Sequence, residues 1–295
     1  MKNVLNLVSF SLVSFAFASA MAVGSTPNSA PNPDGNDTRY DHFFQVDETS
    51  GIIRTQSQDA FLNPLEAGEE LFAEHTEWTQ ELKATLISLL SFELHNENFG
   101  DVNERYQRAK HFGSWVRDGR SNSCYNTRGK VLARDSRIPV GNAGSGCSVA
   151  TGSWADPYAG GNYSSAADIE IDHFVPLKNA YVSGAFRWDY KKRCLYGNFM
   201  GNKFHLLPVY KTENRSKSDR GPEEYMPPNR AYRCQYLVQW LKVKLIWDLE
   251  LTPPEKESVQ SLVKSENCSL QDFVFAKSDL EQQRTFITDN MDLCH

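Results

Sequence analysis

The chain has 295 residues, of which 40% are hydrophobic and 12% aromatic, and its formal net charge at pH 7 is −6. This length allows one large domain or two modest ones, and the hydrophobic content can build a packed core, so a wholly disordered chain is excluded. An acidic average argues against a nucleic-acid partner, but the charge is distributed unevenly along the chain.

Residues 1–20 have the pattern of a secretory signal peptide. Lys2 provides the positive start, residues 4–17 form an apolar run, and Ala18-Ser19-Ala20 supplies a small-residue cleavage site, with Ala22 as an alternative. A membrane anchor is the competing interpretation, but the run is shorter than the roughly 20 residues that span a bilayer. We therefore predict a secreted or periplasmic protein with no membrane partner.

The cysteines fit an oxidising compartment, because all six follow the predicted signal peptide. An even number in an exported protein predicts disulfides, and the lack of a C-x-x-C pair in the sequence argues against a cysteine-rich zinc site. The sequence does not choose among the many connectivities. One hypothesis pairs neighbours in order, as Cys124–Cys147, Cys194–Cys234 and Cys268–Cys294.

Residues 21–105 form an acidic region. Between residues 31 and 105 there are 4 Lys or Arg against 16 Asp or Glu, a net charge of −12. Residues 21–45 are rich in Ser, Pro, Asn and Gly, which is typical of a flexible terminus. Residues 66–94 carry apolar side chains at helical spacing and predict a helix with a scaffold role. A partner-binding or prosegment role is the alternative.

The next segment contains short elements and a glycine-rich stretch. Residues 106–115 predict a short element, residues 124–135 fit either a helix or a strand, and residues 141–161 predict a loop. Because Cys147 lies in this loop, a bridge to Cys124 would tie the loop to the preceding element.

Residues 168–176 alternate polar and apolar side chains, which predicts a half-buried strand with His173 near its end. Residues 204–209 are a second apolar run of strand length, and residues 212–219 predict the start of a helix. The segment overlaps a basic block, since residues 178–220 hold 10 Lys or Arg against 3 Asp or Glu, a net charge of +7. Such a block favours a phosphodiester substrate, with a solvated basic face as the alternative.

The remaining chain predicts helices. Apolar residues recur at helical spacing over residues 236–247, and Pro253-Pro254 ends that helix. Thr252 and Glu255 form a capping box that begins the next helix, and residues 278–281 indicate a last short one.

Residues 168–219 contain the groups that phosphodiester hydrolysis requires. A neutral histidine can activate water, because its pKa lies near the operating pH, and His173 is the candidate base. Carboxylate and amide oxygens are the ligands that Mg²⁺ prefers, so Asp172 and Asn214 are candidate metal ligands. Since adjacent strand residues face opposite sides, Asp172 and His173 could flank the phosphate.

Three motifs in this segment can be compared with known families: Asp172-His173-Phe174-Val175-Pro176, Leu206-Leu207-Pro208-Val209 and Asn214-Arg215-Ser216-Lys217-Ser218-Asp219. They resemble the HNH endonuclease superfamily, and in particular the branch of GmrSD-type nucleases and small secreted bacterial nucleases. The likeness covers roughly residues 106–251 and includes Pro157-Tyr158. It implies an α+β fold, with a ββα-metal HNH core embedded in a mainly helical, disulfide-stapled domain. The expected division is a signal peptide at 1–20, an acidic, mainly helical region at 21–105, the nuclease domain at 106–255 and a helical tail at 256–295.

The resemblance also implies residue roles. His173 would be the general base, and Asp172 and Asn214 would bind one divalent cation, with Mg²⁺ expected first and Mn²⁺ or Ca²⁺ as alternatives. His205 departs from the family pattern, in which Asn is frequent at this position. It could orient His173 through a hydrogen bond or be a structural histidine.

Three further residues have two interpretations each. Arg128 and Lys217 could bind substrate phosphate or form surface ion pairs. Glu170 could be an additional metal ligand, but a solvated strand residue is the favoured interpretation.

We therefore predict an exported, metal-dependent endonuclease that hydrolyses DNA, with RNA as a further candidate substrate. Little sequence specificity is expected, because nothing in the sequence resembles a base-reading module. Degradation of extracellular or foreign DNA is the corresponding role, and no obligate protein partner is inferred. A nuclease toxin or effector and a catalytically inactive nucleic-acid-binding protein are the alternatives.

Overall fold

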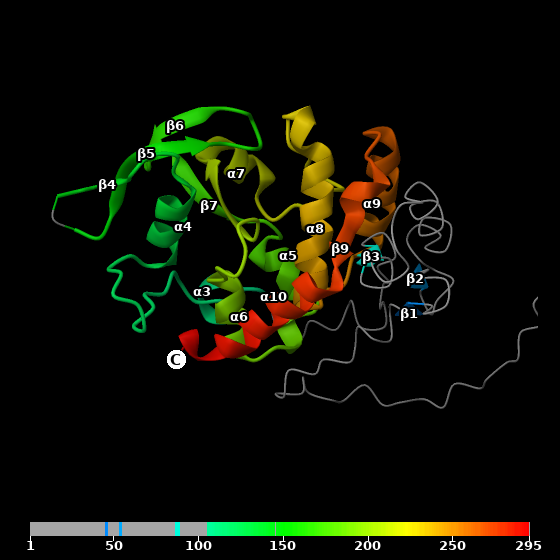
Figure 1. The fold of residues 1–295 in the computed structure, drawn as a ribbon, viewed down its shortest axis with the longest axis horizontal. Coiled ribbons are helices and arrows are strands. Elements are labelled where there is room, and N and C mark those ends of the chain that lie inside the picture. The colour runs from blue at the N-terminus through cyan, green and yellow to red at the C-terminus, as the bar shows by residue number, and fades with distance from the viewer. Residues whose placement is uncertain (1–44, 47–52, 55–85, 89–104, 145, 295) are drawn as a thin grey trace, which may run out of the picture. The chain divides into compact units, whose positions relative to one another are not determined.

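The computed structural model describes residues 105–294, except residue 145, together with three short strands in the preceding part of the chain. Helices and small antiparallel sheets make up this described part, so the chain is an α+β protein, as predicted (Figure 1). Eight α-helices lie within the described residues. None of these helices combines the length and the apolar character that crossing a membrane requires.

The helices and strands keep one numbering along the chain, as Figure 1 labels them. The helices are α3 (Arg108–His111), α4 (Thr127–Asp135), α5 (Leu177–Val182), α6 (Tyr190–Gly197), α7 (Lys211–Lys217), α8 (Arg233–Trp247), α9 (Pro253–Ser265) and α10 (Lys277–Asp289). The strands are β1 (Gln45–Val46), β2 (Ile53–Arg54), β3 (Leu86–Ser88), β4 (Gly141–Asn142), β5 (Val149–Ala155), β6 (Asn162–Ser165), β7 (Ile169–His173), β8 (Leu206–Tyr210) and β9 (Val274–Ala276).

The sheet formed by β4, β5 and β6 packs with α4 over a small core of its own. Trp154 of β5 is completely buried, and its Nε1 donates to the carbonyl oxygen of Leu132 in α4 at 2.8 Å. Leu206 of β8 belongs to the same cluster, which joins the sheet to the next strand pair. The loop predicted over residues 141–161 is therefore wrong where β5 forms, because burial of Val149 and Trp154 outweighs the local preference of the glycines.

Strands β7 and β8 form the antiparallel pair that carries the predicted motifs. Asp172 lies opposite Leu207, and His173 lies opposite Leu206. Helix α7 starts at Lys211, directly after β8, and packs against both strands. The two predicted strands and the helix that follows them are present, although β7 ends at His173 rather than at residue 176. The segment between the strands is not the long loop that the sequence predicts, because it contains α5 and α6.

Helix α8 lies at the centre of the larger hydrophobic core. Tyr236, Trp240 and Trp247 are almost completely buried, which confirms the apolar stripe predicted for this helix. Both α9 and α10 contact α8. Figure 1 shows α8 between β7 and α9. The predicted C-terminal tail is thus part of the same core as the nuclease-like segment.

A buried ion pair connects α8 to α9. Lys244 Nζ lies 3.2 Å from Glu255 Oε2, and both side chains are completely buried. Lys244 also donates to Asn179 Oδ1 at 2.7 Å and to Ser183 Oγ at 2.6 Å. Glu255 and Thr252 form the capping box that the sequence predicts at the start of α9. The predicted domain boundary after residue 255 therefore falls inside a helix whose first turn is fixed to the core.

Part of the predicted N-terminal helix is a strand. We expect a helix over residues 66–94 from the sequence, but Leu86–Ser88 form β3, which pairs with β9 in antiparallel register. The apolar spacing is a local preference, and backbone pairing with a distant strand overrides it here. The rest of that helix, the signal peptide at residues 1–20 and nearly all of the stretch at 21–45 lie outside the described residues.

Three disulfides lie in the described part of the chain. The predicted Cys124–Cys147 bridge is confirmed. The other two predicted pairings are wrong, because the bridges are Cys194–Cys294 and Cys234–Cys268. Residues 291–293 contact α6, the helix that contains Cys194, so packing of the C-terminal end against α6 brings the two cysteines together. This path depends on tertiary packing, which the order of the cysteines does not encode.

Replacing Cys194 and Cys294 together by serine is expected to lower the free energy of unfolding by about 2–4 kcal/mol, because the bridge closes a long loop. The two cysteines are 100 residues apart, whereas Cys124 and Cys147 are 23 apart. Urea denaturation under non-oxidising buffer without thiols measures the change. The matched control is the Cys124→Ser/Cys147→Ser double variant, for which the chain-entropy argument expects a smaller loss. Unchanged stability after removal of the long-range bridge would contradict the prediction.

Candidate active site

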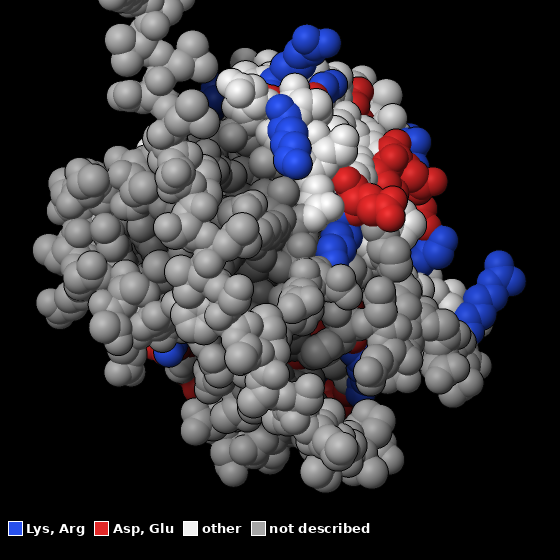
Figure 2. Space-filling view, turned by 90° about the vertical axis from the view of Figure 1, so that its right-hand side faces the viewer, with Lys and Arg blue, Asp and Glu red and all other residues white. Residues whose placement is uncertain are grey.

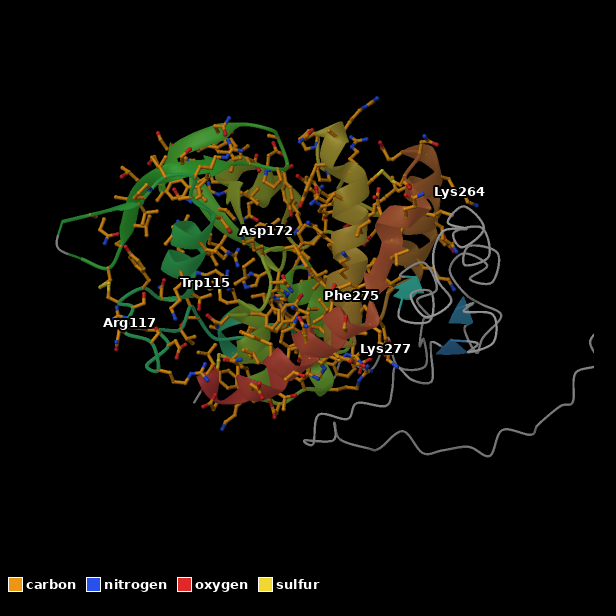
Figure 3. All side chains as sticks on the ribbon, in the orientation of Figure 1. Trp115, Arg117, Asp172, Lys264, Phe275 and Lys277 are labelled. Carbon is orange, nitrogen blue, oxygen red and sulfur yellow. A yellow bond between two sulfur atoms is a disulfide. The ribbon has the colours of Figure 1, made fainter. Side chains whose placement is uncertain are left out.

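A pocket of about 430 Å³ brings together the three residues that the motifs single out. Asp172 and His173 reach it from the end of β7, and Asn214 reaches it from α7. Because α7 follows β8 without a loop and packs across both strands, Asn214 faces the end of β7. Figure 3 marks Asp172 within the described core, with Trp115 nearby in the picture.

The imidazole of His173 is held in two ways. Its Nε2 lies 2.9 Å from the carbonyl oxygen of Gly197, and its ring is stacked on Trp115 with centroids 5.1 Å apart and planes 1° apart. A carbonyl oxygen only accepts, so Nε2 carries the hydrogen and Nδ1 keeps its lone pair. Burial lowers the pKa of His173 to about 3, the Gly197 bond opposes this, and the charges of Arg108 and Lys217 add to it. The ring is therefore neutral near pH 7 and can accept a proton at Nδ1.

Both carboxylate oxygens of Asp172 accept hydrogen bonds from buried groups. The hydroxyl of Tyr158 donates to Oδ2 at 2.6 Å, and Lys217 Nζ donates to Oδ1 at 2.9 Å. Lys217 is completely buried and also donates to the carbonyl oxygen of His173 at 3.2 Å. Burial raises the pKa of Asp172, and Lys217 and Tyr158 oppose that rise. A carboxylate oxygen has two lone pairs, so these bonds fix the group and leave it able to bind a further ligand.

Glu170 orients the side chain of Asn214. Asn214 Nδ2 donates to Glu170 Oε2 at 2.8 Å, and Arg215 Nη2 donates to Glu170 Oε1 at 2.8 Å. Burial tends to raise the pKa of Glu170, but the hydrogen bonds from Asn214 and Arg215 leave it lowered. Because the amide nitrogen is bound, the carbonyl oxygen of Asn214 is the atom available to a ligand. Glu170 therefore fastens α7 to β7, a role that neither sequence interpretation includes.

The donor set of the pocket fits a hard cation with few protein ligands. Within the described residues there is no group of three or more His, Cys, Asp or Glu side chains that could hold a metal ion. The pocket instead offers the carboxylate of Asp172 and the amide oxygen of Asn214. Mg²⁺ commonly binds through one or two protein oxygens and keeps several waters, whereas structural zinc requires four protein ligands. These two residues could thus hold one Mg²⁺, with Mn²⁺ or Ca²⁺ as alternatives.

His205 lies near the site but does not line its pocket. Its Nε2 bonds to the carbonyl oxygen of Tyr196 at 2.8 Å, one residue before the carbonyl that binds His173. Burial lowers the pKa of His205 to about 3, and its Nδ1 has no partner among the described residues. The hydrogen bond that holds His173 is therefore made to Gly197, not to His205, which favours the structural alternative. His205 instead fastens the last turn of α6 beside β8.

The two predicted phosphate-binding residues do not line the pocket either. Arg128 Nη2 donates to the carbonyl oxygens of Ala166 and Ile169, at 3.1 and 2.8 Å, and so holds the start of β7. Lys217 is enclosed and bound to Asp172. It forms neither the surface ion pair nor the exposed phosphate contact that the sequence suggests.

Three residues outside the sequence motifs complete the site. Trp115 stacks on His173, Tyr158 binds Asp172, and Arg108 lines the pocket. The sequence offers a weak signal for two of them, because Arg108 and Trp115 lie in a segment that indicates only a short element. Tyr158 has a stronger one, since Pro157-Tyr158 belongs to the family resemblance.

Comparison with known proteins matches residues 130–259 to the family described as GmrSD restriction endonucleases, C-terminal domain. The chain is also 38% identical over 161 residues to an uncharacterized secreted protein of Arthroderma benhamiae, covering 54% of this chain and 75% of the relative. No solved structure matches the chain. The relative's name and the three disulfides confirm the predicted secreted or periplasmic location. The family match begins inside α4 and ends inside α9, so it includes β7, β8 and α7 but leaves out α3.

Proposed function

Because the chain belongs, over residues 130–259, to the family of GmrSD restriction endonuclease C-terminal domains, we propose that it is an exported, metal-dependent endonuclease. The family implies a nucleic-acid substrate, and we propose hydrolysis of DNA phosphodiester bonds with RNA as a further substrate. The observation that carries the proposal is the pocket shared by Asp172, His173 and Asn214, in which His173 keeps the lone pair of Nδ1. We propose a ββα-metal core formed by β7, β8 and α7.

His173 is the general base in this proposal. Nδ1 takes a proton from a water molecule while the water oxygen attacks phosphorus, and the bond between phosphorus and the leaving sugar oxygen breaks. The Gly197 carbonyl accepts from Nε2–H and stabilises the ring as it becomes positive, and stacking on Trp115 keeps the ring plane fixed. A phosphate anion bound beside the ring would raise the low pKa of His173 towards the range that a general base needs.

Asp172 and Asn214 hold the cation in this proposal. A bound divalent cation supplies positive charge to the scissile phosphate and to the leaving oxygen. Tyr158 and Lys217 keep the carboxylate of Asp172 in one orientation, and Glu170 does the same for the amide of Asn214. The two ligands are thus positioned before the cation binds, which lowers the reorganisation that binding requires.

The pocket wall supports recognition of the nucleic-acid backbone. Arg108, Lys178 and Arg215 line it, and cations beside a hydrolytic site favour phosphate without reading base sequence. On the described part of the face in Figure 2, acidic and basic side chains lie side by side. A surface of mixed sign provides a weaker positive field than a row of cations, so we place the substrate at the pocket.

The direct test is digestion of plasmid DNA and of RNA by the oxidised mature protein across Mg²⁺, Mn²⁺ and Ca²⁺. We expect nicking with at least one of these ions, complete loss with EDTA and recovery when the ion is added back, because Asp172 and Asn214 are the proposed ligands. Asn214→Ala is expected to raise the half-saturating metal concentration by about tenfold or more. The matched control is Thr212→Ala, an exposed position of the same helix that does not line the pocket.

Two outcomes would contradict the proposal. Binding of DNA without cleavage under every ion would favour an inactive nucleic-acid-binding protein. Full activity in EDTA would mean that cleavage does not require a divalent cation.

A further inference from the structure

The pocket contains three cationic side chains whose ionic partners differ. Arg215 is paired with Glu170, and Lys178 is paired with Asp219. Arg108 is exposed, and no carboxylate of the described residues forms an ion pair with it. A phosphate that enters the pocket therefore meets two cations that already have carboxylate partners and one that has none among the described residues.

Trp115 contacts both Arg108 and the proposed base, His173. Its guanidinium carbon is 5.7 Å from the centroid of the Trp115 ring, and the same ring is stacked on His173. Arg108 and His173 also line the same pocket. Contact with an indole does not use the N–H groups of a guanidinium, so these remain able to bind two phosphate oxygens.

We infer that Arg108 binds a backbone phosphate of the nucleic acid in the pocket and so places the scissile bond beside His173. This inference rests on the proposed nuclease function and identifies a substrate-binding residue for it. Arg108 lies before residue 130, so the family match does not include it. The active site of this chain thus takes its phosphate-binding cation from α3, which precedes residues 130–259.

The guanidinium has a geometric advantage over the other pocket cations. Trp115 restricts where the planar group can lie, and a planar fork matches two phosphate oxygens better than an ammonium does. We therefore expect Arg108→Gln to bind phosphate weakly, and Arg108→Lys to retain the charge but lose the paired contact.

The experiment measures binding and cleavage separately in the oxidised full mature chain. Fluorescence anisotropy with a labelled DNA duplex in EDTA gives affinity without turnover, and plasmid digestion with the activating ion gives kcat and KM. We expect Arg108→Gln to weaken metal-free binding by about tenfold and to reduce the slope of log affinity against log salt by about 1. Arg108→Lys should lie between this variant and the wild type. The matched control is Arg117→Gln, an exposed arginine of the same segment that does not line the pocket, which should change affinity less than about twofold.

The outcomes separate this inference from the proposed function. Cleavage by the wild type together with equal affinities for Arg108→Gln and Arg117→Gln would overturn the role of Arg108 and leave the nuclease function standing. No cleavage by the wild type under any ion would instead overturn the function. Thermal melting checks that Arg108→Gln is folded, which we expect because the side chain is exposed.

Discussion

Replacing His173 by alanine is expected to lower the rate of DNA cleavage by about 10²–10⁴-fold. The imidazole is neutral because burial lowers the pKa of His173 to about 3, and its Nε2–H is bound to Gly197. Nδ1 is therefore the ring atom that can take a proton from water. Alanine removes this atom but leaves Asp172 and Asn214, so metal-free DNA binding should change by less than about threefold, as is usual for contacts that act in the transition state.

Chemical rescue distinguishes a missing base from a damaged fold. Added imidazole should enter the space left by the ring in His173→Ala and raise the cleavage rate of this variant at least about tenfold, because it supplies the same proton acceptor. Asn214→Ala also weakens cleavage in the proposed mechanism, but imidazole should not restore its activity. This variant is the control for a general effect of imidazole on the assay.

His205 provides the second control, because it is a buried histidine directly before β8, the strand that pairs with β7, next to the site. His205→Gln keeps a donor for the Tyr196 carbonyl. If the residue is structural, this variant should lower the melting temperature and leave kcat nearly unchanged. A loss of kcat as large as in His173→Ala, without a loss of stability, would return His205 to the orienting role that the family pattern implies. An unchanged rate of cleavage by His173→Ala would mean that His173 is not the general base.

The shared position of the three candidate site residues could be predicted because each lies within or next to a single short element. Asp172 and His173 are neighbours at the end of one strand, and α7 follows β8 directly, so Asn214 is only a few residues from the strand pair. The alternation of residues 168–173 and the short motif at 214–219 encode this arrangement within single elements. The fold class follows from the same elements.

The groups that hold these residues could not be predicted, since they come from distant parts of the chain. Trp115 and the Gly197 carbonyl reach His173 from two different segments, and Tyr158 reaches Asp172 from the turn after β5. No periodicity in the sequence connects them. The disulfide partner of Cys194 could not be predicted for the same reason. Cys294 is 100 residues away and reaches Cys194 only when the C-terminal tail packs.

The burial of Lys217 also could not be predicted from the sequence. A lysine in a polar motif is expected at the surface, since lysine is almost never fully buried unless it is paired. Here the pair is Asp172, on the neighbouring strand. The composition of residues 178–220 correctly indicates a basic segment, but one of its cations neutralises a residue of the site instead of adding to the surface field.

Replacing Lys217 by methionine is expected to lower the free energy of unfolding by about 3–5 kcal/mol, the usual cost of breaking a buried ion pair. Methionine fills a similar volume, so the loss comes mainly from charge rather than packing. Asp172 would remain buried with Tyr158 as its one donor among the described side chains. Urea denaturation of the oxidised protein in EDTA measures the change without a contribution from bound metal.

The double variant Asp172→Asn/Lys217→Met should be more stable than Lys217→Met alone, because it leaves no uncompensated buried charge. The matched control is Arg215→Met on the same helix. The Arg215 side chain is 69% exposed, so loss of its pair with Glu170 should cost less than about 1 kcal/mol. Equal losses for Lys217→Met and Arg215→Met, or additive effects in the double variant, would mean that burial gives the Asp172–Lys217 pair no special strength.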